Sequence, residues 1–243
     1  MNLNPHATKT TNSPNRPTQY INFIFFKVDP AFRRLSKDEQ KRRKDEFQQV
    51  VKEYMNHSDL MLLYYSLVGI RADVDFMLWR ITNRLELFQE MTTKLLHTGL
   101  GQYLTVTYSY LSISKRSMYV DKIEPEHQNS RAFIIPGKYK YLFVYPFVKT
   151  RDWYHLTFAT RQGMMDEHIQ IGNKYPSVKL NTTYSFGIDD QEFVVAFETD
   201  EPKDFLDLVQ ELRETEASRY TLRDTPMYTC IRKNDIDELL ETI

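Results

Sequence analysis

The sequence is poor in several features that would assign it to a common class. Its 243 residues include a single cysteine, Cys230, which excludes an intrachain disulfide and any zinc site built on several cysteines. It contains no apolar run of the ~18 residues that a membrane-spanning helix needs, and its polar first 18 residues lack the apolar core of a signal peptide. We therefore expect a cytoplasmic protein without a membrane span.

The chain also has almost no net charge. Its 32 basic and 33 acidic residues give a formal charge of -1, so no overall field attracts it to nucleic acid, and we expect no nucleic-acid partner. The motifs GxGxxG, GxxxxGK[ST], GxSxG and HExxH are absent as well, which removes four familiar enzyme classes. In contrast, 41% hydrophobic and 14% aromatic residues supply enough apolar surface for a folded core.

Hydrophobic periodicity divides the chain into two halves with the same order of elements. Each half reads strand, helix, strand, strand, helix, strand. A capping box of Ser36 and Glu39 marks the first helix. The predicted strands are 19–28, 60–69, 74–81 and 103–114, then 140–149, 178–187, 192–200 and 227–233; the predicted helices are 36–54, 84–99, 156–172 and 204–217.

The two halves share a short stretch of similar sequence at equivalent positions. A Gly-Ile pair at Gly69 and another at Gly187 stand 118 residues apart, each between two strands. We therefore predict an α+β protein in which two ferredoxin-like (βαββαβ) repeats form a dimeric α+β barrel-type subunit. The expected divisions are a flexible tail (1–18), an N-terminal half (19–118), a linker loop (119–140) and a C-terminal half (141–243).

His168 is the histidine whose surroundings suggest a ligand. It shares one face of its predicted helix with Met164, Met165 and Ile171, at spacings of three and four residues. An imidazole on an apolar stripe could serve as an axial haem ligand, since haem presents iron on a large apolar disc. The alternative is a core or boundary histidine whose ring bonds a backbone carbonyl.

A second pattern lies on the strand 140–149. Alternation places Tyr145 and Lys149 on the same face, where a phenol and an ammonium could hold an anionic substrate. The alternative is an interfacial Tyr and a solvated Lys. Pro146 predicts a strand edge or a bulge at this point.

Taken in order, these motifs resemble a known family. The segment RQGMMDEHIQIGNKY and the FGIDDQEF turn resemble the proximal haem region of chlorite dismutase-like proteins. Arg131, the YPFVK motif at Tyr145 to Lys149, the Trp153-Tyr154 pair and His168 resemble the coproheme decarboxylase branch of that family. The likeness extends from about residue 19 to residue 232, and it implies a haem-binding C-terminal half.

The resemblance implies an enzyme of haem biosynthesis, an oxidoreductase that converts iron coproporphyrin III (coproheme) to haem b with hydrogen peroxide. His168 would be the metal ligand, supported by Glu216, and Tyr145 would form the radical that attacks a propionate. Lys149 and Arg131 would hold propionates by charge-assisted hydrogen bonds, and Tyr119 would contact one. The implied assembly is a homo-oligomer, namely a homopentamer.

One departure from the family bears on activity. The position above the iron, polar in the family, falls on Leu180, or on Asn181 if a one-residue gap is allowed. Leucine cannot hydrogen-bond an iron-bound oxyanion, so we expect no chlorite decomposition. Leu180 also keeps a second function open, a non-catalytic haem or porphyrin carrier or sensor. A third is an oligomeric α+β barrel protein that binds another ligand, with His168 as a core residue.

Overall fold

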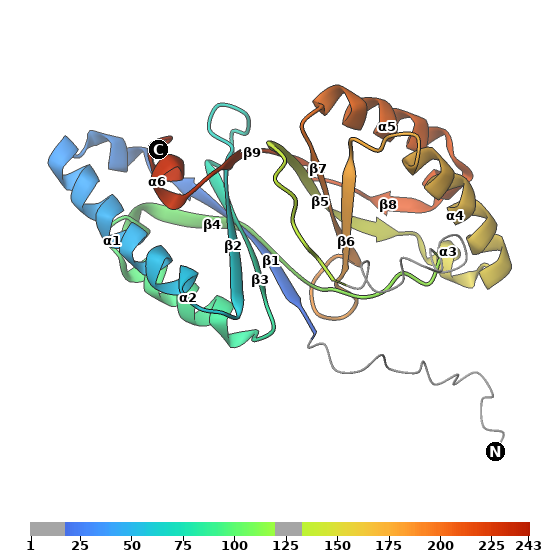
Figure 1. The fold of residues 1–243 in the computed structure, drawn as a ribbon, viewed down its shortest axis with the longest axis horizontal. Coiled ribbons are helices and arrows are strands. Elements are labelled where there is room, and N and C mark those ends of the chain that lie inside the picture. Colours follow the sequence, from blue (N-terminus) through green and yellow to red (C-terminus); the bar gives the residue numbers. More distant parts are fainter. Residues whose placement is uncertain (1–17, 120–132) are drawn as a thin grey trace, which may run out of the picture.

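A computed structural model describes residues 18–119 and 133–243 of the chain (Figure 1). Its main helices and strands follow the predicted order. The first half contains β1 (Tyr20–Val28), α1 (Lys37–Met55), β2 (Leu60–Ser66), β3 (Phe76–Thr82), α2 (Glu86–His97) and β4 (Leu104–Ile113). The second half contains β5 (Tyr141–Lys149), α3 (Arg151–His155), α4 (Phe158–Gly172), β6 (Lys179–Tyr184), β7 (Phe193–Thr199), α5 (Pro202–Glu214), β8 (Thr221–Arg223), β9 (Tyr228–Lys233) and α6 (Ile236–Leu240).

The strands form one antiparallel sheet that closes on itself. The first repeat has the order β4-β1-β3-β2 and the second β6-β7-β5-β9, which is the ferredoxin-like order in both cases. The β2–β9 and β4–β6 pairings join the two repeats, and β8 is a short addition beside β5. The predicted fold class, with two repeats in one barrel-type subunit, is therefore confirmed.

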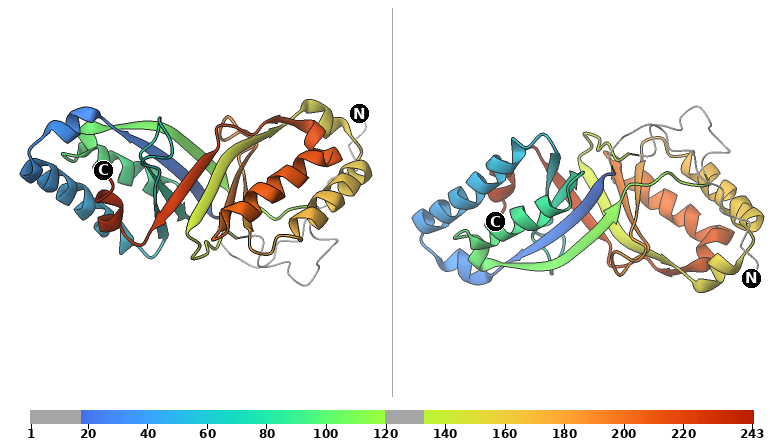
Figure 2. Two further views of the ribbon diagram at one scale, coloured as in Figure 1. Left: turned by 90° about the horizontal axis from the view of Figure 1, so that it is seen from above. Right: turned by 90° about the horizontal axis from the view of Figure 1, so that it is seen from below.

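The barrel separates two kinds of sheet face. Its interior is filled by an apolar cluster to which β1 to β5, β7 and β9 contribute, including Phe23, Trp79, Val144 and Tyr228. The outer face of the first repeat packs under α1 and α2, and the outer face of the second lies under α4 and α5 (Figure 2). Because side chains alternate along each strand, every strand contributes to one interior and one helix-covered layer.

Polar contacts hold the repeats together at the Gly187 turn. The carboxylate of Asp189 accepts the backbone N–H of Leu111 at 2.6 Å, and Gln191 donates to the Leu111 carbonyl at 3.3 Å. Gly187 itself has a φ of 76°, matched by 79° at Gly69, so both Gly-Ile turns use the left-handed conformation that favours glycine. The internal repeat seen in the sequence is thus repeated in the backbone.

The C-terminal segment crosses from one half to the other. Figure 1 shows α6 beside α1, and Ile236, Leu239 and Leu240 are buried in the core of the first repeat. Part of the predicted linker is also packed: Ile134 is buried in the barrel, and its backbone exchanges two hydrogen bonds with the Gln19 side chain. Over the part of the chain that the structure describes, no helix is both long and apolar enough to cross a membrane.

Three short elements, α3, β8 and α6, were not predicted, because three to five residues are too few for a periodic pattern. Pro146 does not lie on an edge strand, since β7 pairs with β5 on one side. On the other side, the β9 pairing ends at Val144 and the β8 pairing begins at Val148, with a register shift there. Proline is therefore tolerated at the gap between two partner strands.

Candidate functional site

The candidate site lies on the helix-covered face of the second repeat. Tyr145 and Phe197 form its buried layer with two residues of α5, Phe205 and Leu208. Ile171 of α4, one turn after His168, packs against the same cluster. As the alternation of β5 predicted, Tyr145 is on this face, whereas Leu142 and Val144 point into the barrel. The predicted phenol and the predicted imidazole helix therefore belong to one layer.

Strand register separates the two candidates for the position above the iron. Leu180 pairs with Phe197, so its side chain is on the same face as Tyr145, and it is 49% exposed. Asn181 is 5% exposed and faces the barrel, where its amide donates to the Glu198 carboxylate at 2.9 Å. Of the two, Leu180 is thus the residue available to a ligand on this face.

Tyr145 is held in apolar surroundings. Its ring stacks on Phe197, with centroids 6.1 Å apart and an interplanar angle of 19°. Burial raises the pKa of the Tyr145 phenol well above its usual value of 10, so the hydroxyl stays protonated at every physiological pH. It can therefore give up a hydrogen atom, but it does not offer a phenolate to a metal.

Lys149 is buried at the end of β5. Its Nζ donates to the Ala217 carbonyl at 2.7 Å and lies 4.6 Å from the centroid of the Trp153 ring. Burial lowers the pKa of Lys149 from 10.5 to about 8, although the carboxylate of Glu192 opposes this shift. The group is therefore a cation at neutral pH whose charge is easily lost above pH 8.

His168 lies near that cation. It is half-buried on α4, as are Met164, Met165 and Ile171, the residues predicted to share its face. Burial, followed by the positive charge of Lys149, lowers the pKa of His168 from 6.5 to about 4. The imidazole is therefore neutral at physiological pH, which is the protonation state that a metal ligand requires.

Glu216, predicted to support His168, occupies the turn after α5. Its carboxylate pairs with Arg219 at 3.2 Å and its side chain is 59% exposed, while its backbone N–H donates to Glu167 at 3.3 Å. Glu167 is the residue before His168 on α4, so the Glu216 turn does reach this helix. The predicted hydrogen bond between His168 and Glu216 stays a prediction.

Tyr119 lies at the N-terminal end of α4. Its ring stacks on Phe158 with centroids 5.9 Å apart, and its carbonyl accepts a hydrogen bond from Gln162 at 3.0 Å. Its ring centroid is 6.4 Å from that of Trp153, the same ring that contacts Lys149. Tyr119 and Lys149 are therefore joined through Trp153, whereas Arg131 falls outside the described residues.

Two residues around Lys149 had no predicted role. Glu192 is buried and accepts hydrogen bonds from the Lys149 backbone at 2.8 Å and from the Tyr154 hydroxyl at 2.6 Å. Trp153, on the unpredicted helix α3, supplies the aromatic face for the ammonium. Their sequence signals were the acidic residue in the DDQEF turn and the WY pair after YPFVK, but neither signal says what the side chain contacts.

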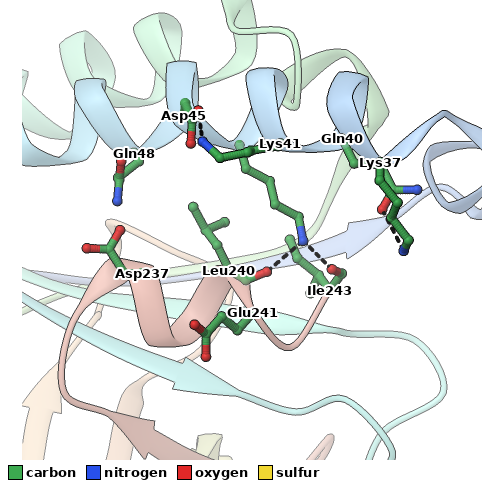
Figure 3. A pocket seen from close by; sticks show the side chains of 10 residues that line it. Lys37, Gln40, Lys41, Asp45, Gln48, Asp237, Leu240, Glu241 and Ile243 are labelled. Atoms are coloured by element: carbon green, nitrogen blue, oxygen red, sulfur yellow. Dashed lines mark hydrogen bonds and ion pairs between the residues drawn. The ribbon is translucent and has the colours of Figure 1, made fainter.

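Two pockets lie away from these residues, on the first repeat and the C-terminal segment that packs against it. One, of about 450 Å³, is lined by residues of α1 and of the C-terminal segment (Figure 3). There Lys44 donates to the carbonyls of Leu240 at 2.8 Å and Ile243 at 2.5 Å, and Lys41 pairs with Asp45. Its cations are thus engaged in internal contacts, which gives the pocket a structural role.

The donor set of the second half suits one kind of metal centre. In residues 18–119 and 133–243, no group of three or more His, Cys, Asp or Glu side chains is arranged to hold a metal ion. A lone neutral imidazole therefore suits a metal whose other ligands come with a cofactor. The apolar layer around Tyr145 would pack against the body of such a cofactor, and Lys149 would face its anionic groups.

Known proteins resemble this chain in sequence and in structure. A coproheme decarboxylase from Mycolicibacterium smegmatis is 30% identical over 219 residues, which cover 88% of this chain and 90% of that protein. Two structures of the chlorite dismutase from Candidatus Nitrospira defluvii, a mutant and a complex with imidazole, superpose with TM-scores of 0.83 and 0.82. Both are 26% identical to this chain and cover 92% of it and 94% of the dismutase.

A family model adds the assignment. The model described as chlorite dismutase matches residues 40–233, from α1 to β9. That range includes the first repeat from α1 onward and the whole second repeat, with the YPFVK strand, His168 and Leu180. With the match spanning most of the sequence and a curated relative at 30% identity, the chain belongs to the chlorite dismutase family.

Proposed function

We propose that this protein is an oxidoreductase that decarboxylates coproheme to haem b with hydrogen peroxide. The observation that carries the proposal is that a neutral imidazole (His168), a protonated buried phenol (Tyr145) and a buried ammonium (Lys149) belong to one half of the barrel, beside one apolar layer. The relative named coproheme decarboxylase supports the choice of substrate.

These residues fit an iron porphyrin. His168 would supply the one protein ligand to the iron, and the layer containing Tyr145 and Phe197 offers apolar surface to the macrocycle. Lys149, together with Arg131 and Tyr119, would hold propionate groups by hydrogen bonds. Leu180 would line the open side of the site, and Glu216 would receive the second N–H of the imidazole.

The balance of the reaction defines what the protein must do. Each propionate loses carbon dioxide and two hydrogens and becomes a vinyl group, while one hydrogen peroxide becomes two waters. When bound, the iron porphyrin supplies the redox chemistry that activates peroxide. Tyr145 would take the hydrogen atom from the propionate carbon after losing its own, and Lys149 would keep that carbon within reach.

The test is a titration of the purified protein. One equivalent of ferric coproheme is bound, hydrogen peroxide is added stepwise, and the porphyrin masses are measured after each addition. Two successive decreases in porphyrin mass, each equal to the conversion of one propionate to a vinyl group, with about two peroxides consumed, support the proposal. Tight coproheme binding with no mass change would contradict it.

A second function is favoured by one observation. Leu180, half-exposed on the face with Tyr145, cannot donate a hydrogen bond to peroxide, so a non-catalytic haem or porphyrin carrier or sensor has the residues it needs. The same titration decides between the two, because a carrier binds porphyrin without changing its mass. We also propose that the protein acts in the cytoplasm and assembles as a homopentamer, which light scattering of the purified protein would measure.

A further inference from the structure

A groove of about 610 Å³ lies in the first repeat, between α2 and β4. Its apolar walls are formed by Leu85, which precedes α2, by Leu96 of α2, and by Val106 and Leu111 of β4. Asn22 and Arg80 are the buried polar residues that line it. The groove shares no residue with the site proposed above, and that function gives its lining residues no role.

Arg80 is an unusual residue for the place it occupies. It is 2% exposed, and burial lowers the pKa of its guanidinium to about 9. Its Nε and Nη2 donate to the Asn22 side-chain oxygen at 3.2 and 2.6 Å, and its Nη1 donates to the Phe88 carbonyl at 3.2 Å and the Thr92 hydroxyl at 2.8 Å. All of these acceptors are neutral, so the described residues give this charge no carboxylate partner.

The second repeat shows what this position needs for packing alone. Asn22 pairs with Arg80 across β1 and β3, and the corresponding pair across β5 and β7 is Phe143 with Phe197. These two rings pack with Phe205 of α5 at centroid distances of 4.0 and 5.0 Å. An apolar pair therefore packs well at these strand positions in the second repeat, whereas the first repeat has a buried cation at the equivalent position.

A buried cation without a counter-ion is costly, and hydrogen bonds to neutral groups offset only part of that cost. These four hydrogen bonds use four of the five guanidinium N–H groups, which leaves one on Nη2. An anion in the groove would offset the charge and accept that N–H. Glu86, exposed at the groove, would repel a ligand with several negative charges.

We propose that this groove binds a monocarboxylate with an apolar body, its carboxylate beside Arg80 and its apolar part between α2 and β4. Charge complementarity with Arg80 selects the anionic head, Glu86 disfavours polyanions, and the leucine and valine walls receive the apolar body. This ligand class differs from a tetracarboxylate porphyrin, so the proposal stands apart from the function of the second repeat.

The test uses decanoate and decan-1-ol as probes, with the purified full chain in isothermal titration calorimetry. We expect saturable binding of one decanoate per chain and at least tenfold weaker binding of the alcohol. Arg80→Gln should weaken decanoate at least tenfold. The matched control is Arg84→Gln, because Arg84 is a neighbouring exposed cation, paired with Glu90, that does not line the groove.

Thr93→Trp gives an independent measurement if Arg80→Gln fails to fold. Thr93 is exposed and lines the groove, so a tryptophan there should fill the space, abolish decanoate binding and leave the fold intact. Equal binding of decanoate and decan-1-ol would overturn the proposal, as would decanoate binding that survives Thr93→Trp. A change in oligomeric state in Thr93→Trp, with no decanoate binding to the wild type, would assign the groove to a second copy of the chain and also overturn it.

Discussion

The ammonium of Lys149 lies 4.6 Å from the centre of the Trp153 ring, over its face. An aromatic face and one backbone carbonyl, that of Ala217, therefore hold a cation that is largely removed from water. The arrangement keeps a positive charge near His168, where burial of the imidazole and then this charge lower its pKa. The cost of burying Lys149 is thus linked to the protonation state of the candidate iron ligand.

Replacing Lys149 by methionine should stabilise the apoprotein at neutral pH. The pKa of Lys149 is about 8 in the folded chain and 10.5 in the unfolded chain, so the folded state binds the proton more weakly. The loss of folding stability that this shift causes is complete below pH 8, and it disappears as the pH rises toward 10.5. We expect Lys149→Met to gain roughly 1–3 kcal/mol at pH 7 and almost nothing at pH 10.5, measured by urea unfolding.

The control for that measurement is Lys140→Met. Lys140 is exposed, and its ammonium lies over the Tyr141 ring on the protein surface. Its replacement should change stability by less than about 0.5 kcal/mol at either pH. A loss of stability in Lys149→Met at pH 7 would show that the contacts of the ammonium outweigh its burial.

Turnover should also depend on the charge of Lys149. Wild-type conversion of coproheme is expected to fall at a pH above 8, because the ammonium that orients a propionate is lost and the propionate itself holds the pKa of Lys149 above the value of about 8 in the ligand-free protein. Lys149→Met should accumulate the three-propionate intermediate at pH 7, where the wild type completes both decarboxylations. Mass spectrometry of the porphyrins at pH 7 and 9 measures both effects, and complete conversion by the variant would remove Lys149 from the mechanism.

His168 should determine both the haem spectrum and the acid stability of the apoprotein. His168→Gln is expected to abolish or strongly shift the Soret band of bound ferric coproheme, whereas His155→Gln, a change at an exposed histidine, should leave it unchanged. The folded pKa of His168 is about 4 against 6.5 unfolded, so the wild type loses stability as the pH falls from 6.5 to 4.

The same pair of variants measures that linkage. Between pH 7 and 5 the wild type and His155→Gln should lose about 2 kcal/mol that His168→Gln does not lose. Parallel pH profiles for all three proteins would show that the imidazole is not held neutral in the folded state.

Much of this arrangement was predictable because the relevant signals are periodic. The alternation on β5 correctly assigned Tyr145 to one face and Val144 to the other, and the repeated Gly-Ile turns correctly predicted two similar halves. Helical spacing also grouped His168 with Ile171, which packs against the Tyr145 layer. In each case the side-chain direction follows from local backbone geometry alone.

The rest depends on contacts between distant segments. Nothing in the local sequence indicates that Lys149 would meet the Ala217 carbonyl, 68 positions away, or that α6 would join the core of the first repeat. The choice between Leu180 and Asn181 required the β6–β7 register, because a shift of one residue exchanges the two faces of a strand. Arg80 had no predicted role, because its burial depends on the position of α2, which the local sequence does not indicate.

Leu180 and Asn181 should respond differently to substitution. The wild type is expected to evolve no oxygen from chlorite, because Leu180 offers no positive charge to an oxyanion on the open face. Leu180→Arg places a cation on that face and should raise oxygen evolution at least tenfold above background, measured with an oxygen electrode.

Asn181→Ala is the matched control. It removes a buried hydrogen bond to Glu198 inside the barrel, so it should cost about 1–3 kcal/mol of stability without altering the spectrum of bound haem or the response to chlorite. A spectral change in Asn181→Ala with none in Leu180→Arg would place Asn181, rather than Leu180, beside the ligand.

Tyr145→Phe tests the chemical step most directly. Phenylalanine keeps the ring that stacks on Phe197 and removes only the O–H, so coproheme affinity and folding should be nearly unchanged. Because the buried phenol is protonated, it can lose a hydrogen atom and later regain one from the propionate carbon, which phenylalanine cannot do. Decarboxylation should therefore stop before the first loss of carbon dioxide, with at least a hundredfold slower conversion.

Tyr141→Phe, on the same strand but outside the buried cluster, should convert coproheme like the wild type. Conversion by Tyr145→Phe at the wild-type rate, read from porphyrin masses during peroxide titration, would show that another group removes the hydrogen.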